Sequence, residues 1–165
     1  MRLVYDRVYV GNQEDCVDEQ TILDDWAVVH ACKFPCHARA VGYTGKSKIS
    51  KKHPNYLSVE HNDHLYLNLI DTLQPLFLPA SFDIFLKFAE KKYAEGGTLL
   101  IHCNQGMSRS ASLALLFLTK SLEVLPPTKY EEAVEAYRKF DPLYAPNFGI
   151  HLFLSHNWKY LLAAG

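Results

Sequence analysis

Short apolar runs recur along the first two thirds of the chain, and each of them predicts a strand. Hydrophobic and polar residues alternate in residues 7–11, and more strongly in residues 64–70, which is the pattern of a half-buried strand. Residues 26–31 and 98–102 are instead almost continuously apolar. Such runs are typical of parallel strands that are covered on both faces. We therefore expect strands at these four places.

Helical periodicity lies between and after these strands. A set of apolar residues repeats at helical spacing before Gly96, which supplies a stop signal; the set is Phe82, Phe85, Leu86, Ala89 and Tyr93. We expect further helices at 13–23, at 110–122 and from Pro146 or Asn147 to about 162. Thr128 and Glu131 form a capping-box pattern that predicts the start of one more helix.

This alternation of strands and helices predicts an α/β fold. We expect a central, mostly parallel sheet of about four to five strands with helices on both faces. The 165 residues fit one domain, 1–165. Residues 32–61 contain two prolines and two glycines without clear periodicity, and we expect an irregular insertion there.

Charge and composition narrow the class of protein. The net charge is -1 and 48% of the residues are hydrophobic, so we expect neither a nucleic-acid partner nor a membrane partner. No apolar run reaches the length of a membrane span, and the first residues lack the apolar segment of a signal peptide. With four cysteines, the chain is expected to be an intracellular, cytoplasmic monomer in a reducing compartment.

The charge is nevertheless sorted by position. Residues 33–60, called the basic segment below, carry six basic residues against one acidic residue, or +5, which leaves -6 on the rest of the chain. If the strand at 26–31 is parallel to its neighbours, this segment starts at their carboxyl edge. It is either a solvated insertion or a guide for acidic substrates.

Residues 103–109 join the strand at 98–102 to the helix at 110–122. In open parallel sheets, ligands bind beyond the carboxyl ends of the strands. Backbone N–H groups and a helix N-terminus in such a loop bind a tetrahedral oxyanion, and Gly106 allows the loop to curl tightly. The planar guanidinium of Arg109 can donate two hydrogen bonds to phosphate oxygens. The positive field of this group and of the helix N-terminus also favours the thiolate of Cys103 over the thiol. The loop therefore predicts a phosphate pocket with a nucleophilic sulfur.

The segment HCNQGMSRS, residues 102–110, resembles the His-Cys-five residues-Arg-Ser/Thr signature of the cysteine-based protein phosphatases. Its Ser-Arg-Ser ending is similar to the ending of this signature in the dual-specificity branch of the family. The likeness runs from VYVGNQED near the start to PNFGIHLFL near the end and is weakest over residues 32–61. It implies that the fold is dual-specificity phosphatase-like and that no metal or other cofactor takes part.

The resemblance also implies roles for individual residues. Cys103 is the nucleophile, Arg109 binds the phosphate, and Ser110 stabilises the departing thiolate. His102 orders the loop and Asn147 supports it, although plain helix caps are alternative roles for Ser110 and Asn147. The loop residues expected to bind substrate beside Arg109 are Asn104, Gln105, Gly106, Met107 and Ser108.

A general acid must protonate the leaving group, and three carboxylates are candidates. Asp63 precedes the strand at 64–70 and is expected at the wrong edge of the sheet. Asp83 is expected on the solvated face of a helix. Asp71 follows the strand directly, at the same edge as Cys103, and the resemblance places the family's acid there too. We therefore predict Asp71 as the catalytic acid and base, with a helix or turn cap as its alternative role.

Weaker patterns concern the remaining cysteines. His30, Cys32, Cys36 and His37 lie close together in HACKFPCH and are a candidate zinc site. Their spacing is not that of a standard finger and no second ligand pair follows, so we expect no metal. Cys32 follows the strand at 26–31 and is also a candidate for a redox disulfide with Cys103.

The expected substrate is a phosphorylated protein or peptide. The loop interior contains no lysine, whereas phosphoinositide phosphatases of this superfamily tend to have one, and no tyrosine-clamping motif is evident. This favours phosphotyrosine and phosphoserine or phosphothreonine as substrates. The alternatives are an RNA 5′-phosphatase or another non-protein phosphatase of the same fold, a phospho-binding pseudo-enzyme and a sulfurtransferase.

Overall fold

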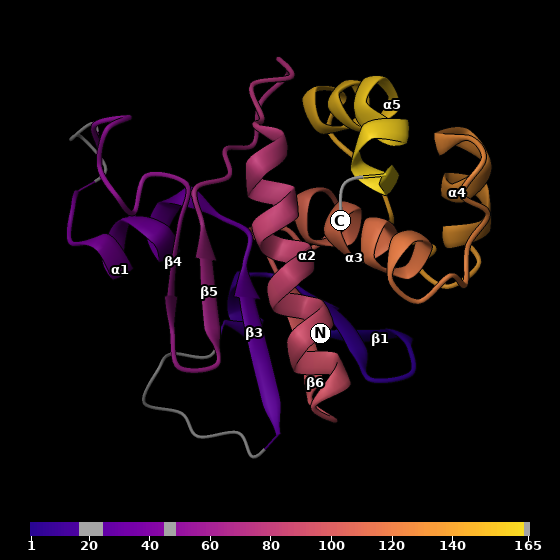
Figure 1. The fold of residues 1–165 in the computed structure, drawn as a ribbon, viewed down its shortest axis with the longest axis horizontal. Coiled ribbons are helices and arrows are strands. Elements are labelled where there is room, and N and C mark those ends of the chain that lie inside the picture. Colours follow the sequence, from indigo (N-terminus) through magenta and orange to yellow (C-terminus); the bar gives the residue numbers. More distant parts are fainter. Residues whose placement is uncertain (17–24, 45–48, 164–165) are drawn as a thin grey trace.

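The computed structural model describes residues 1–16, 25–44 and 49–163. A six-stranded sheet runs through its centre in the order β1-β2-β6-β3-β5-β4. Figure 1 shows that α2 crosses the sheet and that α3, α4 and α5 lie together beside it. The strands are β1 (Arg2–Tyr5), β2 (Val8–Gly11), β3 (Trp26–His30), β4 (Ser58–His61), β5 (His64–Leu67) and β6 (Thr98–His102).

The four inner strands are parallel, as their apolar runs predicted. The count of four to five strands was too low, because β1 and β4 are added antiparallel at the two edges. Both edge strands have four residues and are largely half-buried or exposed, so they lack the apolar run that marks an inner strand. β4 also shows that residues 32–61 are not wholly irregular.

The two faces of the sheet have different side chains, because successive residues of a strand point to opposite faces. Val29, Leu65, Ile101 and Cys103 belong to the main hydrophobic core. The helices packed on this core are α2 (Pro79–Ala94), α3 (Arg109–Lys120), α4 (Tyr130–Tyr137) and α5 (Phe148–Ala163). None of the described helices is long and apolar enough to cross a bilayer.

The other face holds His30, Tyr66 and His102 at the intervening positions. The turn segment η2 (Lys33–His37), which is extended at Phe34, and the short α1 (Ala38–Val41) follow β3. Cys36 of η2 packs on Tyr66. Helices therefore lie on both faces, as predicted.

Two helix predictions need correction. The expected helix at 13–23 starts as a 3-10 helix, η1 (Gln13–Asp15), which ends at an extended Cys16, and residues 17–23 lie outside the described residues. The predicted capping box of Thr128 and Glu131 is wrong, because α4 begins at Tyr130 after an extended Lys129 with no side-chain cap. Burial of the Tyr130 ring against Trp158, with 5.3 Å between ring centroids, anchors this start instead.

Candidate active site

The loop after β6 is curled around the sulfur of Cys103. Gly106 has a positive φ of 76°, and a Cβ there would lie 2.9 Å from the Gly11 carbonyl oxygen, so a glycine is needed for both reasons. This curl brings the Gly106 N–H to 3.2 Å from Cys103 Sγ. Ser110, in the first turn of α3, donates its hydroxyl to the same sulfur at 3.2 Å.

These two donors create a polar setting for a thiol that is 1% exposed. The sulfur also lies in the loop that leads into the N-terminus of α3. The structure places the Ser110 hydroxyl in hydrogen-bond contact with Cys103.

Arg109 joins the loop to the ends of two neighbouring strands. Its Nη1 donates to the carbonyl oxygens of Ala31 at 3.2 Å and Leu69 at 3.1 Å. Its Nη2 donates to Asn104 Oδ1 at 2.7 Å. Its Nε is buried without a hydrogen-bond partner among the described residues. The guanidinium is therefore fixed in place and retains a donor for a ligand.

Asp71 lies at the same edge as Cys103 and Arg109. Its Oδ2 is 3.5 Å from Arg109 Nη2, and its Oδ1 accepts a hydrogen bond of 2.9 Å from Asn147 Nδ2. Its side chain is 31% exposed, so the carboxylate can meet both a substrate and water. Sequence reasoning placed this residue correctly at the carboxyl edge.

The other two carboxylates lie elsewhere. Asp63 pairs with Lys92 at 2.6 Å at the opposite end of the strands, which agrees with the prediction. Asp83 is half-buried in α2 rather than solvated, and its Oδ1 has no hydrogen-bond partner within the described part of the chain. The expectation of a solvated Asp83 was therefore wrong, because its Oδ1 is buried.

Asn147 contacts both Asp71 and the loop after β6. Its side chain binds Asp71, and its backbone N–H donates to Ser108 Oγ at 2.9 Å. The side chains of Gln105 and Met107 lie exposed on the loop, and Asn104 is half-buried. Asn147 also accepts from the Phe148 N–H at 2.9 Å, so it caps α5 as well.

Two supporting residues were missed by the sequence reasoning. Arg2 Nη2 donates to the Gly106 carbonyl oxygen at 2.6 Å, and Arg2 also forms two hydrogen bonds of 2.7 and 2.8 Å with the buried Asp141. The two residues are 139 positions apart in the chain and neither belongs to a motif, so no local pattern connects them. They hold the outer side of the catalytic loop.

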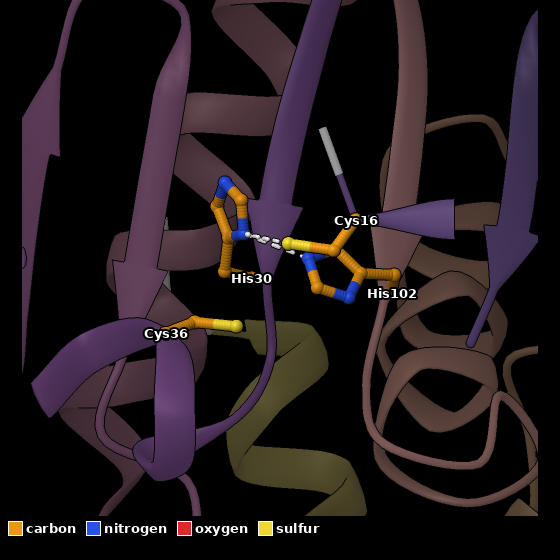
Figure 2. A group of neighbouring side chains, drawn as sticks. All are labelled: Cys16, His30, Cys36 and His102. Carbon is orange, nitrogen blue, oxygen red and sulfur yellow. Dashed lines mark hydrogen bonds between the residues drawn. The ribbon is translucent and has the colours of Figure 1, made fainter. Parts of the chain in front are cut away.

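The ring of His102 points away from the loop that it precedes. Its Nε2 lies 2.7 Å from His30 Nδ1 on the neighbouring strand, where the two residues are register partners. Figure 2 shows both rings beside Cys16 and Cys36. Of the four residues in the candidate zinc group, His30 and Cys36 join this cluster. His37 instead bonds Tyr43 and the Asn55 carbonyl, and Cys32 Sγ lies 2.8 Å from Cys36 Sγ.

Comparison with curated proteins finds phosphatases. Tyrosine-protein phosphatase vhp-1 of Caenorhabditis elegans is 29% identical over 148 residues, which cover 88% of this chain and 19% of that protein. Dual specificity protein phosphatase 16 of Homo sapiens is 24% identical over 141 residues, which cover 86% and 18%. The chain thus spans about a fifth of the length of these relatives. No family model matches it.

Solved structures decide the fold. Human DUSP28 superimposes with a TM-score of 0.65 at 17% identity, covering 98% of both chains. The chain has the dual-specificity phosphatase fold. The human tyrosine phosphatase-like serine/threonine/tyrosine-interacting protein has the same score and identity over 98% of this chain and 97% of its own. The fold that the resemblance of HCNQGMSRS implied is thereby confirmed.

Proposed function

We propose that the protein is a cysteine-dependent protein phosphatase that hydrolyses phosphotyrosine and phosphoserine or phosphothreonine through a phosphocysteine intermediate. One observation carries this proposal. Cys103 Sγ lies where the Gly106 N–H and the Ser110 hydroxyl converge, on a loop whose Arg109 contacts Asp71. Nucleophile, anion site and acid therefore occupy one edge of the sheet.

In the first step, Cys103 Sγ attacks the phosphorus and forms an S–P bond. The bond from phosphorus to the ester oxygen breaks, and Asp71 gives its proton to that oxygen. Arg109 stabilises the equatorial oxygens, and its buried Nε gains the acceptor that it otherwise lacks among the described residues. Pre-oriented donors of this kind supply much of the transition-state stabilisation.

In the second step, water attacks the phosphocysteine and Asp71 accepts its proton. The S–P bond breaks, inorganic phosphate forms, and the thiolate returns. The Ser110 hydroxyl, 3.2 Å from the sulfur, stabilises the leaving thiolate. Asn147 holds the Asp71 carboxylate in position for both proton transfers.

The proposed substrate is a singly phosphorylated protein side chain. The loop interior offers no lysine for a second phosphate, and proteins of similar sequence are named as dual specificity protein phosphatases. We further propose that residues 1–165 act as one catalytic domain, with residues 32–61 as a basic insertion.

The test compares phosphate release from four substrates: a phosphotyrosine peptide, a phosphothreonine peptide, a 5′-triphosphorylated RNA and an inositol phospholipid. We expect turnover of both peptides, and loss of that turnover in Cys103→Ser. Cys32→Ser is the matched control, because it removes another buried thiol without touching the loop. Preference for the RNA or the lipid would assign another phosphatase class, and phosphopeptide binding without turnover by the wild type would assign a pseudo-enzyme.

A further inference from the structure

A second group of reactive side chains lies behind the catalytic loop. Cys16 Sγ, His30 Nδ1, Cys36 Sγ and His102 Nε2 converge, and the ligand atoms of these four residues all lie within 4.8 Å of one another. His30, Cys36 and His102 are buried and Cys16 is half-buried. Figure 2 shows the four side chains meeting in front of the strands, on the face opposite the core helices. The phosphatase mechanism uses none of these sulfurs.

The spacing within the cluster is close to that of a tetrahedral metal site. Zinc ligands at 2.3 Å for sulfur and about 2.0–2.1 Å for nitrogen lie about 3.6 Å apart for a sulfur–nitrogen pair in a regular tetrahedron. The Cys16 Sγ to His30 Nδ1 distance is 3.6 Å. The two histidine nitrogens, 2.7 Å apart, would need to separate by roughly 0.6 Å to reach tetrahedral spacing.

An outer hydrogen bond already orients one ligand. His30 Nε2 lies 2.9 Å from His64 Nδ1 on the adjacent strand. If Nε2 carries the hydrogen and donates it, the lone pair of Nδ1 points to the centre of the cluster, as metal-binding histidines require.

Zinc binds thiolates, so uptake of the ion would release the protons of the Cys16 and Cys36 thiols.

We propose that Cys16, His30, Cys36 and His102 bind one Zn²⁺ ion in a closed tetrahedral site on the sheet face opposite the core helices. Two thiolates and two imidazoles are a donor set that suits zinc, while hard cations prefer oxygen. Four protein ligands leave no open position, so the ion is structural and takes no part in phosphate chemistry.

The site would join segments that are far apart in sequence. Cys16 follows η1, His30 ends β3, Cys36 lies in η2, and His102 ends β6 directly before the nucleophile. Zinc would therefore fix the start of the catalytic loop and the segment that carries Phe34, whose carbonyl oxygen accepts from Asn104 at 3.1 Å. This departs from the expectation of no metal, and it replaces Cys32 and His37 of the sequence-derived group with Cys16 and His102.

The direct test is metal content. The full chain is produced with zinc in the medium, purified under reducing conditions and analysed by plasma mass spectrometry, and we expect about one zinc per chain. Exchange into Co²⁺ should give the visible d–d bands of a tetrahedral ion and thiolate-to-cobalt charge-transfer bands in the near ultraviolet. Both readouts are independent of phosphatase activity.

Variants assign the ligands. Cys16→Ser and Cys36→Ser should each lose most of the zinc and lower the unfolding temperature by more than about 5 °C. Cys32→Ser is the matched control, because Cys32 is a buried thiol that lies 2.8 Å from Cys36 Sγ, yet this variant should retain the ion. Circular dichroism checks that each variant is folded.

Two results would overturn the proposal. One is a reduced wild type with four titratable thiols that takes up neither Zn²⁺ nor Co²⁺ from a stoichiometric supply. The other is zinc that is lost in Cys32→Ser and kept in Cys16→Ser, which would assign a different ligand set. If the ligand variants do not fold, the cobalt spectrum of the wild type tests the proposal by itself. Absence of thiolate-to-cobalt charge-transfer bands would contradict the site.

Discussion

At the scale of single residues, the chemistry depends on contacts made by side chains from distant parts of the chain. Asp71 reaches Arg109 across 38 positions, and Asn147 reaches Asp71 across 76. Each of these contacts orients a group that the proposed mechanism uses. Single substitutions therefore separate their roles.

Replacing Asp71 tests the acid. Asp71→Asn keeps the shape of the side chain but removes its proton transfer, so kcat should fall roughly 10²–10⁴-fold for an alkyl or weakly acidic phenyl phosphate. With a strongly acidic phenol as leaving group, the loss in the first step should shrink, because that oxygen needs no proton. The ratio kcat/KM over a series of aryl phosphates measures this dependence, because it reports the first step even where hydrolysis of the phosphocysteine limits kcat.

Asp63→Asn is the matched control for this series, since Asp63 lies at the opposite end of the strands with Lys92. It should leave kcat unchanged for every leaving group. An equal loss of kcat/KM for all leaving groups in Asp71→Asn would contradict the assignment of the acid, because kcat/KM reports the first step without the hydrolysis of the intermediate.

Replacing Arg2 tests the support of the loop. Arg2→Ala leaves the buried Asp141 without its charged partner and removes the bond to the Gly106 carbonyl. Because Arg2 is 26% exposed, we expect a loss of about 2–4 kcal/mol in the free energy of unfolding, near the lower end for a broken buried pair. Urea unfolding measures this free energy.

Arg39→Ala is the control, because Arg39 is exposed, and it should change the free energy of unfolding little. A similarly small effect of Arg2→Ala would refute the supporting role of Arg2.

At the scale of elements, close packing positions the acid loop against the last helix. Gly149 lies in the first turn of α5, and a Cβ there would overlap the carbonyl oxygens of Thr72 and Gln74. The helix can approach residues 72–74 this closely only because position 149 has no side chain. The backbone just after Asp71 is thereby held near Asn147.

Gly149→Ala should therefore displace the acid without touching the nucleophile. We expect kcat for a weakly acidic leaving group to fall about 10–100-fold, because small misplacements of catalytic groups have effects of that size. The rate of Cys103 alkylation by iodoacetate should stay unchanged. Ser155→Ala, whose hydroxyl bonds within the same helix, is the control. Equal loss of both readouts would mean general damage to the fold.

Sequence patterns predicted most of these elements because their causes are local. Hydrophobic periodicity was enough to predict the inner strands and α2. The loop of the site could be predicted from its position between β6 and α3. The edge strands lack an apolar run, and Tyr130 begins α4 through a contact with Trp158 that no local pattern reveals. No local pattern reveals the ion pair of Arg2 with Asp141 or the proximity of Cys16 to His102 either, since both depend on tertiary packing.

At the scale of the whole molecule, charge is distributed unevenly along the chain. The basic segment carries +5 and the remainder of the chain -6. It begins at the active edge, where the Lys33 N–H donates to the Leu69 carbonyl at 2.8 Å and Phe34 contacts Asn104. Lys51 and Lys52 are exposed, while Lys46 and Lys48 lie outside the described residues.

This arrangement predicts electrostatic steering of acidic substrates. Replacing Lys46, Lys48, Lys51 and Lys52 together by serine should lower kcat/KM for an acidic phosphopeptide at low salt, with the difference vanishing as salt rises. A small neutral aryl phosphate should react as before. Unchanged kcat/KM for the acidic peptide at low ionic strength would leave the segment as a solvated insertion.

The central claim is that Cys103 carries the phosphoryl group between the two steps. The most direct measurement is rapid-quench mass spectrometry of Asp71→Asn with an aryl phosphate of a strongly acidic phenol, because the first step then needs no acid while the second lacks its base. We predict that the mass of one phosphoryl group appears on the peptide containing Cys103 within the first turnover. Continued turnover with no adduct, or an adduct on a peptide without Cys103, would contradict the account.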